Sequence, residues 1–417
     1  MNLRLAPSTP RAAWLSLAGF LTLTAAAATP SERLDHLHET LHLESPNSEV
    51  IMDASGLADL EFYTIDKYPP AILFSRNDLL WNPRLSLFLD TRLGSHLYSL
   101  VQFRVDRGFD PNAKGETAKR FDEYFLRYTP FDDGKLNLQV GKFATVAGNW
   151  VARHDSWHNP LINAPLAYEN ILAISDQRAP ASINNFVRRR DQPDNKPAWL
   201  PVLWGPSYAS GASVFGLVNS FEYAVEIKNA SLSSRPTVWD SDALGWENPT
   251  YSARIGYRPN AAWRIGFSGS FGTYLLPGAA GTLPAGKDIG DYNQITIAHD
   301  IEYSWRHWQF WGEIFASRFE VPRVGNADSL SYYLEAKYDL TPHWFLAGRW
   351  NQQLFDKVND GAGGRADWDR DAWRIDASLG YRLDRHWQAK LGYSYTHQKG
   401  TLQQGEQLVS GQLTLKF

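Results

Sequence analysis

The sequence predicts an all-β chain, a transmembrane antiparallel β-barrel of about 16 strands (roughly 14 to 18). Three observations point to this fold. Apolar and polar residues alternate with a period of two, connections alternate between short and long, and aromatic residues flank the short connections. The 417-residue chain is 14% aromatic and has no cysteine, which excludes thiolate zinc sites, iron–sulfur clusters and disulfides.

The chain begins with a predicted secretory signal peptide, residues 1–28. Arg4 and Arg11 precede the apolar run from Ala12 to Leu23, and small residues follow at Ala25 to Ala28. The run is shorter than the roughly 20 residues that a membrane-spanning helix needs. We therefore expect an exported protein. Its nearly neutral charge argues against nucleic acid as a partner.

An N-terminal segment, 29–56, is expected on the periplasmic side of the barrel, with a short amphipathic helix at 32–43. The stretch His38-Glu39-Thr40-Leu41-His42 also matches the H-E-x-x-H pattern of zinc metalloproteases. No domain precedes it, and no third ligand is recognisable nearby. We therefore interpret it as part of a helix in or under the barrel mouth, and we expect no enzyme activity, no metal and no cofactor.

Alternation of apolar and polar residues marks the strands. At the C-terminus, Val409, Leu413, Leu415 and Phe417 alternate with polar neighbours. Such runs exceed the 5–6 residues usual in soluble sheets and suit the roughly 9–11 residues of a tilted transmembrane strand. The predicted barrel spans 57–417, with strands near 57–66, 81–92, 95–106, 120–129, 135–143, 207–217, 220–230, 248–258, 261–273, 292–304, 307–319, 329–340, 343–354, 370–383, 386–398 and 405–417.

The predicted connections alternate between tight turns and long loops. Short periplasmic turns opposite long extracellular loops are typical of outer-membrane barrels. Tyr257 and Trp263 flank one short turn, and Tyr338 and Trp344 flank another, which predicts an aromatic belt at the periplasmic interface. The long connections are expected at 67–80, 107–119, 144–206, 231–247, 274–291, 320–328, 355–369 and 399–404.

The C-terminal residues Val409 to Phe417 resemble the assembly signal of Gram-negative outer-membrane porins, with apolar residues at alternate positions and a final aromatic, Phe417. The segment Gln139 to Gly148 loosely resembles a strand of the phosphate-selective O/P type porins, but no ladder of lysines accompanies it, so phosphate selectivity is not implied. This interpretation implies location in the cell outer membrane. The partners it implies are outer-membrane lipids, the barrel assembly machinery and small polar solutes or ions, with a homotrimer as a candidate assembly.

The connection 144–206 is the candidate pore constriction. Long connections without clear strands tend to be functional, and this one is rich in apolar and aromatic residues, which favours folding into the lumen. Its charged residues include Arg153, Asp155, Arg178 and the run Arg188, Arg189 and Arg190. Arginines in a constriction favour anions. The alternative is that the arginine run forms a solvated surface patch.

The rest of the lumen is expected to carry charges of both signs, which screen one another. The sequence therefore predicts a porin, a water-filled channel for passive diffusion of small polar solutes or ions, with a lean toward anions. The alternative is a sleeve or export barrel for a partner such as a multihaem cytochrome or an anionic polysaccharide. Residues expected to face the lumen include Arg104, Arg127, Arg254, Arg264, Arg349, Arg374, Glu302 and Glu335.

Two further alternatives were weaker. The loop containing Asp360, Asp367, Asp369 and Asp371 has the carboxylates of a calcium site. His299, predicted on the lipid face between isoleucines, is the histidine that a phospholipase-type barrel would need. The glycines of the aspartate-rich loop, Gly361, Gly363 and Gly364, favour a flexible linker instead, and a phospholipase would need a serine beside the histidine on the outer face, whereas Thr296 and Ser304 are predicted to point inward.

Overall fold

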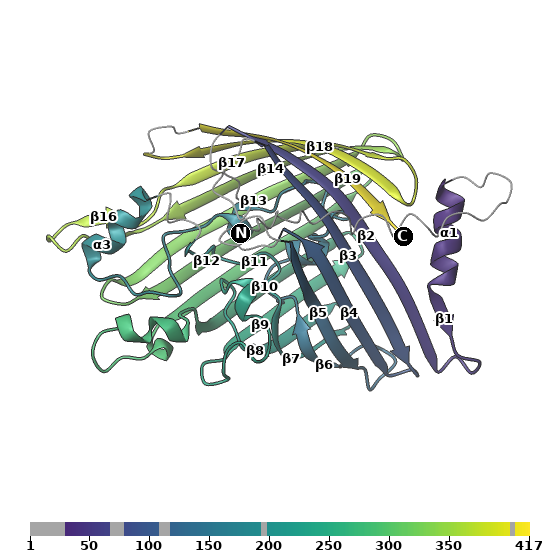
Figure 1. Ribbon diagram of the computed structural model, residues 1–417, viewed down its shortest axis with the longest axis horizontal. Helices are drawn as coiled ribbons and strands as arrows, with labels where there is room; N and C mark the ends of the chain where they lie inside the picture. The colour runs from purple at the N-terminus through teal and green to yellow at the C-terminus, as the bar shows by residue number, and fades with distance from the viewer. Residues whose placement is uncertain (1–29, 67–78, 108–116, 193–197, 401–404) are drawn as a thin grey trace, which may run out of the picture.

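The computed structural model describes residues 30–66, 79–107, 117–192, 198–400 and 405–417; the expected signal peptide lies outside these residues. The described chain forms a closed antiparallel β-barrel (Figure 1). The barrel strands are β2 (Val50–Ile65), β3 (Leu79–Leu93), β4 (Leu97–Asp106), β5 (Ala118–Tyr128), β6 (Asn137–Phe143), β7 (Ala209–Val218), β8 (Phe221–Lys228), β9 (Thr250–Asn260), β10 (Trp263–Thr273), β11 (Asn293–Trp305), β12 (Trp308–Val321), β13 (Gly325–Asp339), β14 (Trp344–Phe355), β17 (Ala372–Arg382), β18 (Trp387–Gln398) and β19 (Gly405–Lys416).

The barrel closes between its first and last strands. β19 pairs with β2, for example Gln412 with Glu61, and each other strand pairs with its neighbour along the chain. The main sheet of the described chain has 17 strands. Sixteen of them form the ring, as predicted. The remaining strand, β1 (His42–Glu44), pairs with the first residues of β2, which extend beyond the end of β19. β2 begins at Val50 rather than at residue 57, because β3 continues to Leu93 and pairs with it there.

The last residue completes the pairing of β19 with β2. The Phe417 backbone N–H donates to the Gly56 carbonyl at 3.0 Å, and the Gly56 N–H donates to the Phe417 carbonyl at 2.8 Å. The Phe417 ring occupies the space where a Cβ on Gly56 would lie. Of the other predicted assembly-signal residues, Val409 and Leu413 are exposed on the outer face and Leu415 is half-buried.

The alternating pattern separates the two faces of the wall. On paired strands β10 and β11, Phe267 and Ile297 are exposed on the outside, whereas Ser268 and Asp300 are buried on the inside. An apolar outer face and a polar inner face are what a barrel surrounded by lipid requires. Aromatic residues beside the short turns meet across strands as ring pairs, such as Trp344 with Tyr381 at 4.5 Å.

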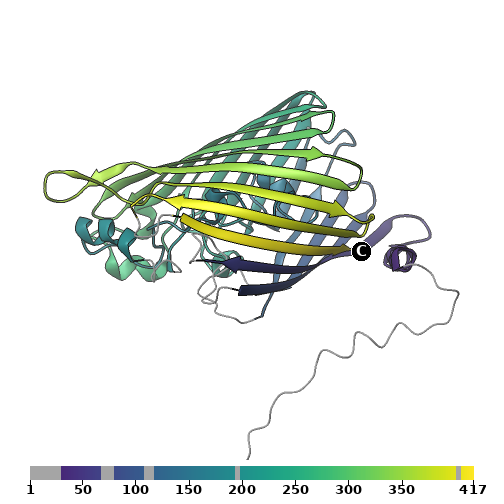
Figure 2. The ribbon, with the colours of Figure 1, turned by 90° about the horizontal axis from the view of Figure 1, so that it is seen from above.

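The two ends of the barrel differ. We call the end with the tight turns, such as 261–262 and 306–307, the short-turn end, and the opposite end the long-loop end. Figure 2 shows short loop helices gathered at the long-loop end, opposite α1. The predicted long loop at 320–328 is wrong, because β12 and β13 are joined by 322–324 alone. Both strands continue this far because Phe319 and Ala327 are fully buried against the inserted loops.

The long connections contain short regular elements. They are β15 (Lys357–Asn359), β16 (Arg365–Asp367), α2 (Leu166–Glu169), α3 (Ile183–Val187), η1 (Trp150–Arg153), η2 (Arg188–Asp191), η4 (Pro236–Val238), η5 (Pro277–Thr282) and η6 (Ile289–Asp291). Of these, η1 and α2 lie inside the barrel. The predicted loops at 67–80, 107–119 and 399–404 lie largely outside the described residues. No helix among the described residues is long and apolar enough to cross a membrane.

The N-terminal helix α1 (Pro30–Thr40) lies outside the barrel wall at the short-turn end (Figure 1). Asp35 holds it to the β17–β18 turn by an ion pair with Arg385 and a 2.9 Å contact with His386. The hydrogen bond with His386 holds the pKa of Asp35 below its usual value. The predicted helix at 32–43 is too long, because β1 follows Thr40 and His42 there contacts Asp53.

The H-E-x-x-H pattern is therefore divided between a helix and a strand. Its two histidines do not share one helical face, which the zinc site of a metalloprotease needs. No group of three or more His, Asp or Glu side chains among the described residues is arranged to hold a metal ion. In the aspartate-rich loop, Asp360 instead accepts backbone N–H groups of Ala362 and Gly364.

We predict that Ile255→Arg destabilises the barrel. Ile255 is 59% exposed in the middle of the outer face of β9, and an arginine near the bilayer centre costs about 2–4 kcal/mol. Unfolding in lipid vesicles, followed by urea titration and heat-modifiable migration, measures this. Asn260→Arg, at the short-turn end of the same strand, is the matched control and should stay close to the unsubstituted protein. Equal stability of both variants would contradict the assignment of the outer face.

Candidate channel site

The connection between β6 and β7 folds into the barrel. Its aromatic residues Tyr168 and Trp204 are fully buried and pack in one cluster with Phe315 and Tyr333 of the barrel wall. The edge-to-face contact between Tyr168 and Phe315 has a centroid distance of 5.6 Å. Burial of these apolar side chains explains why the segment does not extend into water.

A carboxylate on the wall receives the first part of this loop. Glu313 of β12 accepts backbone N–H groups from Asn149 and, at 2.9 Å, from Trp150. The Tyr168 hydroxyl donates to the other carboxylate oxygen at 2.8 Å. These three donors satisfy a side chain that is only 3% exposed, as a buried carboxylate requires.

Buried ion pairs attach the next part of the loop. Arg153 pairs with Glu335 of β13 at 2.5 Å, and Glu169 pairs with Arg374 of β17 at 2.5 Å. Arg349 of β14 bridges Glu335 at 3.2 Å and Asp376 at 3.0 Å. The charges of loop and wall therefore form one continuous network. Removing one member of such a buried network leaves an unpaired charge, at a cost of about 3–5 kcal/mol.

Strands β17 and β18 hold the loop by its backbone. The Lys390 ammonium donates to the carbonyls of Ser156 at 2.7 Å and Asn159 at 2.8 Å. The Ser378 hydroxyl donates to the Pro160 carbonyl at 2.6 Å. These contacts place residues 149–169 against β12–β18. The residues just before them, 144–148, are held by Glu123 of β5, Glu226 of β8 and Arg254 of β9.

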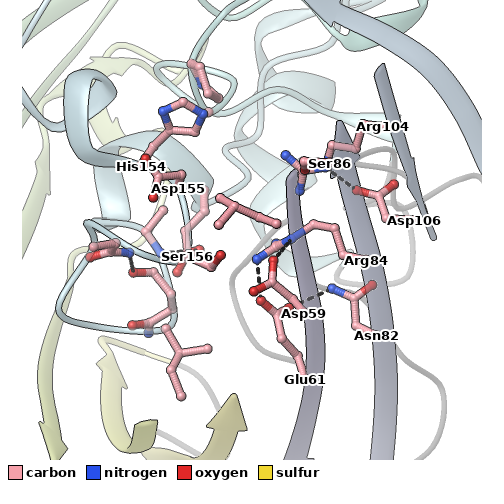
Figure 3. Close-up of a pocket in the computed structure, with 18 of the residues that line it drawn as sticks. Asp59, Glu61, Asn82, Arg84, Ser86, Arg104, Asp106, His154, Asp155 and Ser156 are labelled. Atoms are coloured by element: carbon pink, nitrogen blue, oxygen red, sulfur yellow. Dashed lines mark hydrogen bonds and ion pairs between the residues drawn. The ribbon is translucent and has the colours of Figure 1, made fainter. Parts of the chain in front are cut away.

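An inner cavity of about 130 Å³ lies against the opposite wall, between β2–β4 and the loop. Figure 3 shows Asp59, Glu61 and Arg84 on the strands facing His154 and Asp155 of the loop. Arg84 is held by Asp59 at 2.9 Å and by Glu61 at 2.6 Å. Because two carboxylates share one arginine, this part of the wall has an excess of negative charge.

Further along the same cavity, charges of opposite sign are matched. Arg104 pairs with Asp106 at 2.7 Å, and Arg120 pairs with Asp106 and Asp122 at 2.6 Å each. Trp150 also lines the cavity, and its buried indole N–H has no hydrogen-bond partner among the described residues.

A larger cavity of about 600 Å³ lies toward the short-turn end, lined by the loop and by strands β5–β10. Four arginines line it, Arg127, Arg254, Arg258 and Arg264, with Glu222 between two of them. His154 lines both cavities. The Tyr208 hydroxyl lies 2.5 Å from its Nε2 and the Val151 carbonyl 2.5 Å from its Nδ1, so the imidazole is held in place between the two cavities.

The structure separates the predicted constriction residues into two groups. Arg153 and Asp155 lie inside the barrel, with Asp155 lining the inner cavity. Arg178 and the run Arg188 to Arg190 lie with α3 and η2 at the long-loop end, beside β16 (Figure 1). None of these four arginines lines either cavity described above.

Within this second group, exposure varies along the chain. Arg178 and Arg188 are exposed. Arg189 is buried and donates to the carbonyls of Ala173 at 3.3 Å and Arg178 at 3.1 Å. Arg190 is half-buried and donates to the Asp367 carbonyl. Arg178 and Arg188 are therefore the two arginines of the group that face solvent.

The predicted lumen residues lie on the inner wall. Arg104, Arg254, Arg349, Arg374 and Glu335 are buried there. Arg127 and Arg264 are half-buried and line the larger cavity, and Glu302 is half-buried at the position paired with Arg264 in the sheet.

Sequence reasoning missed several residues that shape the site. Asp59 and Glu61 of the first barrel strand alternate with outward-facing Leu60 and are buried inside. Their spacing of two was the available signal. The role of Glu313 and the contact between His154 and Tyr208 could not be predicted from such a pattern, because each depends on where the loop meets the wall.

We predict that Glu335→Gln loosens the inserted loop and leaves the barrel folded. The change removes the charge that holds Arg153 and Arg349, so hydrogen exchange should become faster across 149–164. Asp328→Asn on the same strand is the matched control, because its pair with Arg318 is largely exposed and contributes about 0–1 kcal/mol. Exchange that is unchanged in both variants would show that the buried pairs do not hold the loop.

Comparisons with known proteins agree on the fold. No protein-family model matches the sequence, and no curated protein matches it. The solved structure of OmpT, an outer membrane protein of Vibrio cholerae, is 11% identical with a TM-score of 0.57, covering 90% of this chain and 99% of that one. The anion-selective porin from Comamonas acidovorans is 11% identical with a TM-score of 0.53, covering 88% and 100%.

A third similar structure is the outer membrane channel DcaP of Acinetobacter baumannii. It is 10% identical with a TM-score of 0.53, and the match covers 90% of this chain and 99% of that one. At such low identity the likeness concerns the fold alone. The predicted closed antiparallel β-barrel is confirmed, and its fold is similar to that of the three structures named above.

Proposed function

We propose that this protein is an outer-membrane channel through which small polar solutes and ions diffuse passively. The observation that carries the proposal is the position of the inserted loop: residues 149–169 pack against β12–β18, and two cavities remain beside the loop, lined by β2–β4 and by β5–β10. Polar and charged side chains line both cavities, as a water-filled passage requires. The likeness to structures described as porins and as an outer membrane channel supports the same function.

The proposed orientation follows from the two ends of the barrel. The short-turn end, with α1 beside it, faces the periplasm, and the long-loop end faces the outside. Export would depend on the predicted signal peptide 1–28. Lipids contact the apolar outer face, and the assembly machinery reads the terminal strand with Phe417. A homotrimer remains a prediction, which the mass of the detergent-solubilised assembly would test.

The described lumen weighs against a sleeve or export barrel. A multihaem cytochrome or a polysaccharide chain would need a continuous wide bore, whereas the loop packs inside the barrel against its wall. Such a partner would first have to displace the buried ion pairs of Arg153 and Arg374. Passive diffusion of small solutes needs no such displacement.

We predict that deleting 160–200 raises single-channel conductance in planar bilayers. The deleted residues include much of the apolar cluster, such as Tyr168 and Phe186, so the half of the lumen next to β12–β18 would open to water. Heat-modifiable migration first verifies that the barrel is folded. A folded variant with unchanged conductance would contradict the proposed role of the loop, and an unsubstituted protein without channels would contradict the function itself.

The lean toward anions is a separate part of the proposal, and it concerns the long-loop end. Arg178 and Arg188 are exposed there, where positive charge raises the local concentration of anions. We predict that Arg178→Ala with Arg188→Ala shifts the reversal potential under a salt gradient toward cations, most clearly at low ionic strength. Arg365→Ala, an exposed arginine that is paired with Asp356, is the control. Equal shifts in both variants would contradict a specific role of Arg178 and Arg188.

A further inference from the structure

The arginines that face the lumen differ in what neutralises them. Five of the six arginines predicted to face the lumen form ion pairs with carboxylates of the wall or of the inserted loop: Arg104 with Asp106, Arg254 with Asp300, Arg264 with Glu222, Arg349 with Asp376 and Arg374 with Glu169. The sixth, Arg127 of β5, has no ion pair among the described residues. Its guanidinium carries a full positive charge at any physiological pH.

The contacts of Arg127 leave one edge of its guanidinium unused. Nε and Nη2 both donate to the amide oxygen of Gln139, at 3.0 and 2.9 Å. The rings of Tyr98, Phe125 and Phe215 lie around the group, with centroids 5.3, 5.2 and 5.0 Å from Cζ. A guanidinium has five N–H donors, so the parallel pair on Nη1 and Nη2 remains available.

Arg127 also belongs to the lining of a solute-sized space. Arg127 lines the 600 Å³ cavity together with the apolar side chains of Phe143, Phe215 and Leu217. Glu123 lines it too, but one of its oxygens accepts the Ala144 N–H at 2.8 Å, and it lies beyond ion-pair distance of Arg127. Arg258 and Arg264 share the single carboxylate of Glu222, which adds positive charge to the same cavity.

We propose that Arg127 binds small organic carboxylates as they pass through the channel. The carboxylate accepts the two parallel N–H groups of Nη1 and Nη2 in a bidentate pair, and the apolar part of the solute packs against the aromatic lining. The aromatic rings and Gln139 hold the guanidinium in place before the solute arrives, which lowers the entropy cost of binding.

The inner cavity is a poorer candidate for the same anion. Its arginines, Arg84 and Arg104, are each held by carboxylates that also line that cavity. An anion there would compete with Asp59, Glu61 and Asp106 for the same donors. This inference rests on the proposed channel function, because the solute must reach the cavity from water.

The test is current block by benzoate in planar bilayers containing the full-length mature protein. Benzoate should reduce the chloride current in a saturable manner, and acetate should do so more weakly because it has little apolar surface. Arg127→Gln should weaken benzoate binding about tenfold to hundredfold, the loss expected for hydrogen bonds to a charged group. Arg127→Lys keeps the charge but not the parallel donors, so it should restore only part of the block.

Arg264→Gln is the matched control, because it removes a paired arginine from the same cavity and leaves Glu222 bound to Arg258. It should weaken benzoate binding much less than Arg127→Gln does, because Arg264 adds charge to the cavity without making the bidentate contact. Equal losses in Arg127→Gln and Arg264→Gln, full rescue by lysine, or equal block by acetate and benzoate would each overturn the proposed site. Open-channel conductance without any benzoate block would overturn this inference alone, whereas the absence of conductance would overturn the channel function.

Discussion

The attachment of the inserted loop to one side of the wall decides the shape of the lumen. Glu313, Glu335, Arg349 and Arg374 hold residues 149–169 by hydrogen bonds and ion pairs that are almost fully buried. The apolar cluster around Tyr168 then packs behind these contacts. Residues 149–169 therefore pack against β12–β18, and two cavities remain between the loop and strands β2–β10.

Burying charged side chains of this kind raises the free energy of the folded protein unless every partner is present. A single arginine facing a filled lumen would lose its hydration without compensation, whereas Arg349 is shared between Glu335, Asp376 and loop carbonyls. The net stability from such a network is small, because desolvation offsets much of the attraction. What the network contributes is one defined position for the loop, since any shift of the chain would leave several charges unpaired.

The same argument separates structural charges from functional ones. Charges within the loop network are occupied by partners and are poorly available to a solute. The charged side chains that keep unused donors or that outnumber their partners lie along β2–β10. They are Arg127 in the larger cavity, and Asp59 and Glu61, which share one arginine, in the inner cavity. Solute preference therefore depends on which wall charges the loop leaves without a full set of partners.

The sequence by itself determined the barrel, because alternation of period two and the difference between short and long connections are local properties of the chain. It indicated the inward side of strands such as β17, where Arg374 and Asp376 alternate with Trp373 and Ile375, and it indicated a loop folded inward from its apolar load. It misjudged the start of β2 and the 320–328 loop, since strand ends depend on neighbouring partners. Only the tertiary structure decided that Arg153 belongs to a buried network while Arg188 faces solvent, because pairing with Glu335 is set by contacts between residues far apart in the chain.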